Sequence, residues 1–154
     1  MEFTTKDRKK VVDTLFKNKI VPLFNQHGFK RHTKTSKRLF KTLEKELSVF
    51  VFFEYKSRFG SYDITIVYFD DDYGNVYDDN YLAMANCKKP SFRGDSSEAL
   101  NLSIDQWMLD MESVVFPFIE QHATYKSILA SNDFYISKAR EREIKALMKR
   151  KSES

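Results

Sequence analysis

Three histidines and one cysteine are the side chains of this chain best suited to acid–base or nucleophilic chemistry. His27 and His122 lie at the ends of the two main predicted helices, His32 lies on a predicted strand, and Cys87 precedes two lysines that would lower its pKa. None of them lies in a triad-like pattern or in an HExxH zinc motif. A histidine at a helix end also complements the negative pole of the helix dipole. We therefore predict that the protein is not an enzyme, and an enzyme that uses His27 or His122 remains the alternative.

Acidic residues are concentrated in two turns, Asp70–Asp72 and Asp78–Asp79, where carboxylates could bind a hard cation such as calcium. Gly74 follows Asp70 by only four residues and no glutamate closes the loop, so the EF-hand spacing is absent. The four glycines of the chain form neither a GxGxxG nor a GxxxxGK phosphate loop. We predict solvated turns, no metal and no cofactor, and no small-molecule substrate is evident.

A basic cluster accompanies the aromatic residues Phe29 and Phe40. The candidate contacts for nucleic acid or for a protein partner are Lys30, Arg31, Lys34, Lys37 and Arg38. The run 50–53 (FVFF) matches the end of the RNA-recognition signature in which sheet aromatics stack on bases, but the preceding basic–glycine–aromatic part is missing. If the cluster and the basic C-terminal tail share one face, nucleic acid binding is favoured. If they diverge, a protein partner or plain solubility explains them better.

Charge is segregated along the chain. Residues 1–45 carry 13 Lys/Arg against 4 Asp/Glu (+9), residues 46–81 carry 2 against 8 (−6), residues 82–136 carry 4 against 7 (−3), and residues 137–154 carry 7 against 3 (+4). Oppositely charged surfaces suit a charged protein partner or self-association. The predicted function is therefore a non-enzymatic protein-binding or accessory domain, and a nucleic-acid-binding module is the alternative.

The elements that would position these residues centre on a β-hairpin. Residues 47–55 and 62–69 alternate with period two, are rich in Val, Ile, Phe and Tyr, and flank the turn at Gly60. Phe50, Phe52, Val67 and Phe69 make the second face apolar as well, so both faces need at least partial cover. The hairpin is therefore expected to lie in the interior and not in open solvent.

Helices and further strands surround the hairpin. Val12, Phe16, Ile20 and Phe24 recur every four residues and predict a helix that starts at Thr4, is kinked at Pro22 and stops at Gly28. Strands are expected at 29–33 and 37–43. A helix capped by Ser103 is expected over 103–121, and a short helix over 125–129. A last helix is expected from its cap at Ser137 to about Lys149. This last helix should dock weakly or fray from Arg150. Residues 70–102 are hardest to interpret, with an edge strand or short helix at 76–85.

The predicted fold is thus α+β: an N-terminal helix, a four-stranded antiparallel meander with an extra edge strand as an option, and C-terminal helices packed on the sheet. Residues 1–136 would form a single domain and residues 137–154 a charged C-terminal helix or tail. With 154 residues and 42% hydrophobic content the chain can bury a core, and its single cysteine excludes an internal disulfide. It has no signal-like or membrane-spanning apolar run, so we expect no membrane association and a cytoplasmic location.

Two stretches resemble a known family. They are the opening Pro22-Leu23-Phe24 with Gly28-Phe29-Lys30-Arg31, and the strand pair that carries Val49, Val51, Phe53 and Ser57 before Asp63 to Phe69. Over residues 10–70 the chain is similar to the bacterial domain-of-unknown-function family 4304. The resemblance implies a small α+β domain with no established reaction and no active residues. Some small bacterial families of this shape act as immunity or accessory proteins, which is an analogy.

Overall fold

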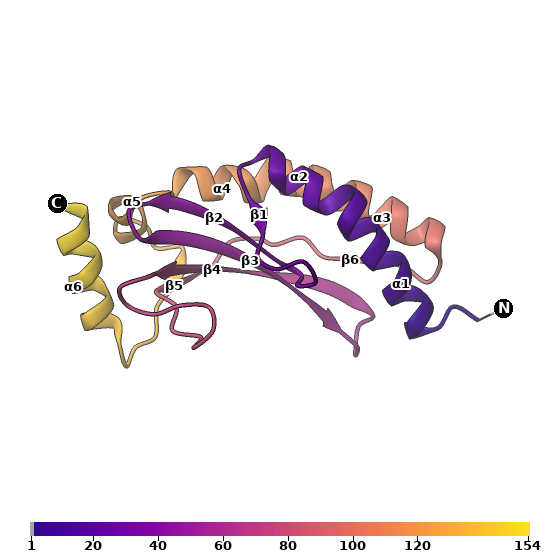
Figure 1. The fold of residues 1–154 in the computed structure, drawn as a ribbon, viewed down its shortest axis with the longest axis horizontal. Coiled ribbons are helices and arrows are strands. Elements are labelled where there is room, and N and C mark those ends of the chain that lie inside the picture. The colour runs from indigo at the N-terminus through magenta and orange to yellow at the C-terminus, as the bar shows by residue number, and fades with distance from the viewer. Residues whose placement is uncertain (1) are drawn as a thin grey trace.

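The computed structural model describes residues 2–154 and has an α+β architecture (Figure 1). In chain order the elements are α1 (Thr5–Leu15), η1 (Phe16–Ile20, a π-helical segment), α2 (Val21–Gln26), β1 (Lys30–Arg31), β2 (Arg38–Glu44), β3 (Leu47–Lys56), β4 (Ser61–Asp70), β5 (Ala83–Ala85), β6 (Phe92–Arg93), α3 (Ser97–Asp110), η2 (Met111–Val115, also π-helical), α4 (Phe116–Gln121), α5 (Tyr125–Leu129), β7 (Phe134–Tyr135) and α6 (Glu141–Ser152). The N-terminus and α6 lie at opposite ends of the molecule.

The sheet is antiparallel throughout and larger than predicted. Its strands follow the order β1-β2-β3-β4-β5-β7, and β6 pairs separately with β4. The central hairpin is confirmed, with β3 and β4 paired without a break from Leu47 opposite Asp70 to Lys56 opposite Ser61. The predicted α+β fold and four-stranded meander are confirmed by β1 to β4, and β5 lies at the place of the optional extra edge strand. The predicted count of strands is too low because β6 and β7 are also present. β5, β6 and β7 each have only two or three residues, too few for a period-two pattern to be visible.

Both long helical segments contain a π-helical turn that ends two residues before a proline. Pro22 follows η1, and Pro117 follows η2. At the end of each turn a backbone N–H donates to the carbonyl five residues earlier, from Val21 to Phe16 and from Phe116 to Met111. Proline lacks an N–H and crowds the carbonyl four residues before it, and the wider turn accommodates this. The helix therefore continues through Pro22 and ends before Gly28, whose φ is +84°.

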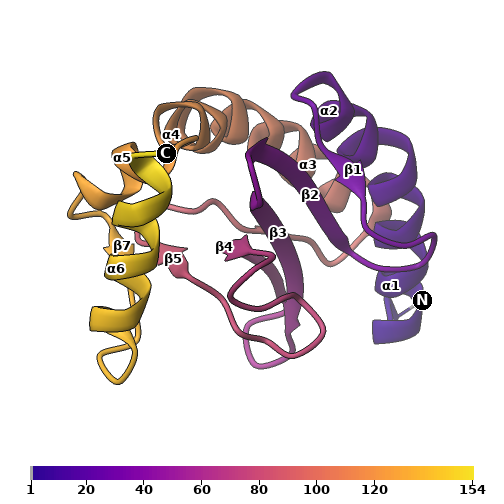
Figure 2. The same ribbon diagram turned by 60° about the vertical axis from the view of Figure 1, so that its left-hand side comes forward.

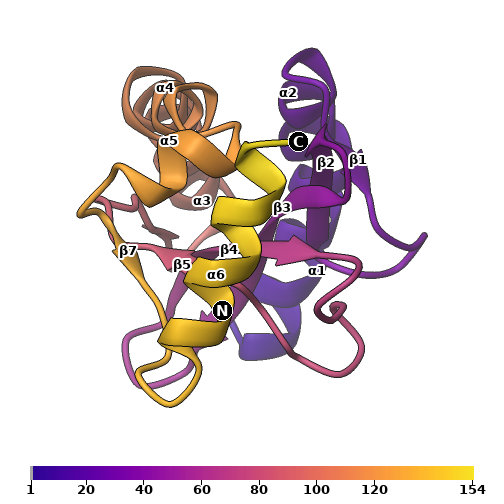
Figure 3. The ribbon, with the colours of Figure 1, turned by 90° about the vertical axis from the view of Figure 1, so that its left-hand side faces the viewer.

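The two helical segments cover one face of the sheet, which we call the helix face (Figure 3). Phe24 of α2 has its ring centroid 5.1 Å from that of Phe116 in α4 and 6.4 Å from that of Trp107 in α3. The strands contribute fully buried side chains to the same core, among them Val49, Val51 and Ile66. Aromatic packing therefore joins the two helical segments to each other and to the hairpin.

Two predicted helix starts are wrong. The third helix begins at Ser97 and not at Ser103, because the Ser96 hydroxyl accepts the N–H of Ala99 at 3.0 Å and caps the helix earlier. Ser103 lies inside α3, and its hydroxyl accepts the N–H of Arg93 at 3.1 Å. The last helix begins at Glu141 after Arg140, without a side-chain cap from Ser137.

The expectation that the last helix docks weakly and frays from Arg150 is also wrong. Helix α6 continues to Ser152, and Ile144 and Met148 belong to the same hydrophobic core as the helix face of the sheet. Lys151 is buried too, although it lies in the final turn. A buried lysine requires acidic partners, and these lie at the end of β4.

Candidate functional site

The second face of the sheet, which we call the open face, carries an aromatic cluster. The pleat places the side chains of Arg38, Phe40, Phe50, Phe52, Thr65, Val67, Phe69 and Met84 on it. Its buried members, Phe50, Val67 and Phe69, pack with Val76 from the segment between β4 and β5. Within residues 2–154 the cluster contains no helical residue, and in Figure 2 the loop after β4 lies on the opposite side of the strands from α3 and α4. The open face is thus covered by the loop segment 71–82 and by the His32 ring, whose centroid lies 5.3 Å from that of Phe50, and by no helix among the described residues.

The aromatic rings of this face form a continuous strip. Phe40 and Phe50 are stacked with centroids 5.4 Å apart, and Phe50 lies 5.9 Å from Phe52. Phe50 is only 7% exposed, whereas Phe40 and Phe52 are half-buried. The Arg38 guanidinium lies 4.6 Å from the centroid of the Phe52 ring. The strip therefore runs from a covered centre to a half-exposed end at Phe52 and Arg38.

The five basic residues singled out from the sequence do not form one surface. Lys30 and Arg38 lie on the open face, in register with Phe40 and Phe52. Arg31 points to the helix face, with its guanidinium 4.9 Å from the ring of Phe16. Lys37 forms an ion pair with Asp13 of α1. Lys34 is exposed in the turn before β2. The basic α6 lies at the far end of the sheet, so the cluster and the tail diverge.

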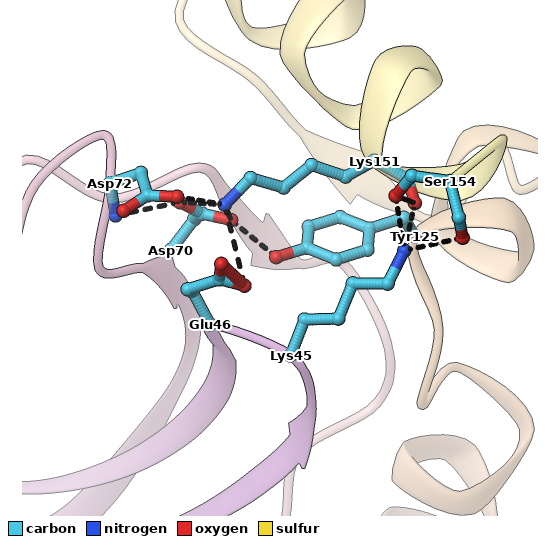
Figure 4. A network of polar contacts seen from close by, with 7 residues as sticks. All are labelled: Lys45, Glu46, Asp70, Asp72, Tyr125, Lys151 and Ser154. Carbon is cyan, nitrogen blue, oxygen red and sulfur yellow. Dashed lines mark hydrogen bonds and ion pairs between the residues drawn. The ribbon is translucent and has the colours of Figure 1, made fainter.

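A buried ion-pair network joins the end of β4 to α6 (Figure 4). The Lys151 ammonium lies 2.9 and 2.7 Å from the two carboxylate oxygens of Asp70, which is fully buried, and 2.7 Å from Asp72. Glu46 lies 3.7 Å away, and the Tyr125 hydroxyl donates to Asp70. The network explains why Lys151 can be buried. The sequence offered no signal for it, because Asp70 and Lys151 are 81 residues apart.

The titration behaviour of this network follows from burial and hydrogen bonding. Burial acts to lower the pKa of Lys151, but hydrogen bonds to Asp70 and Asp72 outweigh it and raise that pKa. The hydrogen bond from Lys151 lowers the pKa of Asp72. Burial, followed by the hydrogen bond to Asp70, raises the pKa of Tyr125. The network therefore favours a protonated Lys151, an ionised Asp72 and a neutral Tyr125.

We expect pH to affect the wild-type chain and a Lys151→Met variant differently. The pKa of Asp72 is depressed below 3.8, so its stabilisation is present above that value and lost as the pH falls through the folded pKa. The pKa of Lys151 is raised above 10.5, so its stabilisation is present below that value and lost as the pH rises through the folded pKa. Urea midpoints measured from about pH 2.5 to pH 11.5 should fall at both ends for the wild type. The variant lacks the Lys151 hydrogen bond that is the main cause of the lowered Asp72 pKa, so its loss at acid pH should be smaller. Parallel profiles for the two chains would contradict this assignment.

His27, His122 and Cys87 each contact neighbouring residues of the fold. Nε2 of His27 lies 3.0 Å from the carboxylate of Glu112, and its ring stacks on Phe116. Nδ1 of His122 donates to the carbonyl of Phe118. Between Glu2 and Ser154, no imidazole is hydrogen-bonded to a serine, threonine or cysteine side chain. Burial raises the pKa of the Cys87 thiol, although Lys89 opposes this, and a thiol with a raised pKa is a poor nucleophile.

Fold and site together define an α+β protein with one helix-covered sheet face and one aromatic face under a loop. Compared with known proteins, the chain matches no family model, no curated protein and no solved structure at a significant level. The resemblance to family 4304 therefore stays a prediction.

Across the described chain, no group of three or more His, Cys, Asp or Glu residues is placed to hold a metal ion. No helix in the same residues is both long and apolar enough to cross a membrane.

Proposed function

We propose that this chain is a non-enzymatic binding module that docks a protein partner on the open face of its sheet. The observation that supports the proposal is the unequal cover of the sheet. Two long helical segments pack on the helix face, whereas the loop segment 71–82 and the His32 ring lie on the aromatic strip of the open face. A half-covered apolar face on a sheet is a typical protein-interaction surface.

The composition of the open face fits the same proposal. Aromatic residues, methionine and arginine are enriched at protein interfaces, and tyrosine and arginine dominate among the residues that contribute most binding energy. Phe52 is half-buried beneath Arg38, and Met84 lies in the same cluster. At the other margin Tyr77 is 81% exposed. A partner that covers Phe52 would bury its ring and restrict Arg38, whose guanidinium already lies over that ring.

A charge reversal at Arg38 should test this surface. We expect Arg38→Glu to weaken partner binding at least about tenfold, which corresponds to roughly 1.4 kcal/mol. The partner is first captured by a photo-crosslinking amino acid at Thr65, which is paired with Phe52 in the register. Capture is carried out with the full chain in the cells from which the sequence derives, and the affinity is then measured by titration calorimetry with the purified partner.

The chain offers a matched control for this variant. Arg58 lies 5.7 Å from the ring of Phe59 in the hairpin turn, so Arg58→Glu removes the same kind of arginine–aromatic pair outside the open face. It should leave binding unchanged, and a cross-linker at Lys17 on the helical side should yield no adduct. Equal loss in both variants would contradict the proposal. A nuclease-sensitive adduct with steep salt dependence would instead assign the face to nucleic acid.

A further inference from the structure

A pocket of about 220 Å³ lies on the open face beneath the loop that follows β4. Phe40, Phe50 and Phe69 line it, and Val76 and Tyr77 are contributed by the loop. Aromatic faces carry negative charge density, and they attract ammonium and guanidinium groups. The apolar lining also suits the aliphatic stem of a long side chain.

Two acidic residues, Glu46 and Asp71, also line this pocket. The backbone N–H of Asp71 donates to the Glu46 carbonyl at 3.1 Å, which places the two residues together. Nearby, Lys151 is engaged by Asp70 and Asp72 and reaches Glu46 only at 3.7 Å. Asp71 has no ion-pair partner anywhere in residues 2–154. The pocket therefore combines an aromatic lining with a carboxylate that is available to a cation.

The rest of the polar lining consists of hydroxyl and amide side chains and the imidazole of His32. Thr42 and Ser48 contribute hydroxyls, and His32 lies with Nε2 3.4 Å from the Tyr77 hydroxyl. Lysine and arginine are absent from the residues that line the pocket. An anionic ligand would thus meet two carboxylates and no fixed positive charge. A cation with a hydrophobic stem has complementary charge and shape.

We propose that this pocket receives a basic side chain, lysine or arginine, of the protein that docks on the open face. The inference rests on the proposed function, because it identifies what the partner presents to that face. The alkyl stem lies against the phenylalanine rings, and the cationic head reaches Asp71 and Glu46. The partner is then a protein with a basic residue at the centre of its contact surface.

The test is an NMR titration of the full ¹⁵N-labelled chain with Nα-acetyl-lysine methylamide. We expect saturable amide shifts at Thr42, Ser48 and Val76 with a dissociation constant on the order of millimolar, as befits a single side chain. The neutral norleucine analogue should bind at least about fivefold more weakly. The Asp71→Asn variant should bind the lysine probe more weakly than the wild type, by a similar factor. Asp79→Asn, in the same loop but outside the pocket lining, is the matched control and should change nothing.

Several outcomes would overturn the inference. Equal binding of the norleucine analogue, shifts confined to another surface, or an Asp71→Asn variant that binds as the wild type does would remove the charge-based recognition. Tighter binding of butylamine than of the blocked lysine would assign the pocket to free amines, and shifts with calcium chloride alone would assign it to a metal. The titration needs no partner, and the Arg38 experiment needs no occupied pocket. Failure of one is therefore distinguishable from failure of the other.

Discussion

Replacing Lys151 with methionine is expected to lower the free energy of unfolding by about 3–5 kcal/mol. Asp70 is fully buried, and its carboxylate would retain only the Tyr125 hydroxyl and the N–H of Asp72 as hydrogen-bond donors. An ionised carboxylate without a counter-charge is costly in the protein interior. The loss is a large fraction of the roughly 5–15 kcal/mol that a domain of this size has in total.

Helix α6 supplies the control for that prediction. Lys149 is exposed on the same helix, so Lys149→Met changes the same atoms outside the network and should alter stability by less than about 0.5 kcal/mol. The double variant Lys151→Met with Asp70→Asn removes both charges and should recover part of the loss. Urea denaturation followed by circular dichroism measures the free energy of unfolding of the two single variants and of the double variant. Equal effects of the two lysine substitutions would show that the ion pair is not needed to hold α6.

The second large effect is expected at Trp107, the only tryptophan of the chain. Its ring lies 5.5 Å from those of Phe53 and Phe92 and 6.4 Å from that of Phe24, and its indole N–H donates to the carbonyl of Pro90 at 3.1 Å. One side chain thus connects α3 to β3, β6 and α2. Trp107→Ala should cost about 3–5 kcal/mol, because the surrounding elements cannot collapse into the cavity together.

Two further variants separate the contributions at this position. Trp107→Phe keeps an aromatic ring but leaves the carbonyl of Pro90 without its donor, and it should cost less than the alanine variant. Leu102→Ala lies on the same helix at a side chain that is 65% exposed, and it should change stability by less than about 0.5 kcal/mol. Denaturation midpoints measured by circular dichroism rank the stability of the three variants. A Leu102 variant as destabilised as the Trp107→Ala variant would contradict the packing described for α3.

The ion-pair network and the proposed binding surface lie next to each other in the chain. Asp70 and Asp72 are held by Lys151, whereas Asp71 between them lines the pocket of the open face. The network therefore fixes the backbone on both sides of the residue that the further inference assigns to a cation. In this arrangement α6 supports the binding face without contributing to it.

Local patterns were sufficient wherever a structure depends on neighbours in the chain. Period-two alternation predicted strands at 47–55 and 62–69; β3 is one residue longer at its end, and β4 is one residue longer at each end. Spacing by four predicted the helix that carries Val12 and Phe24, with Gly28 after its end. Both signals work because side-chain direction repeats with the backbone geometry of a single element. The need for cover on both faces of the hairpin was visible for the same reason.

Two features could not be predicted from local patterns and depended on tertiary contacts. They are the cover of the open face and the set of basic residues that lie on it. Arg31 and Arg38 are seven residues apart and equally basic, yet strand register sends one to Phe16 and the other to Phe52. The docking of Lys151 required Asp70, 81 residues earlier, and the loop pocket required residues from β2, β3, β4 and the segment beyond. Contacts between side chains far apart in the sequence produce no periodic sequence pattern, because these side chains come together only when the helices pack on the sheet.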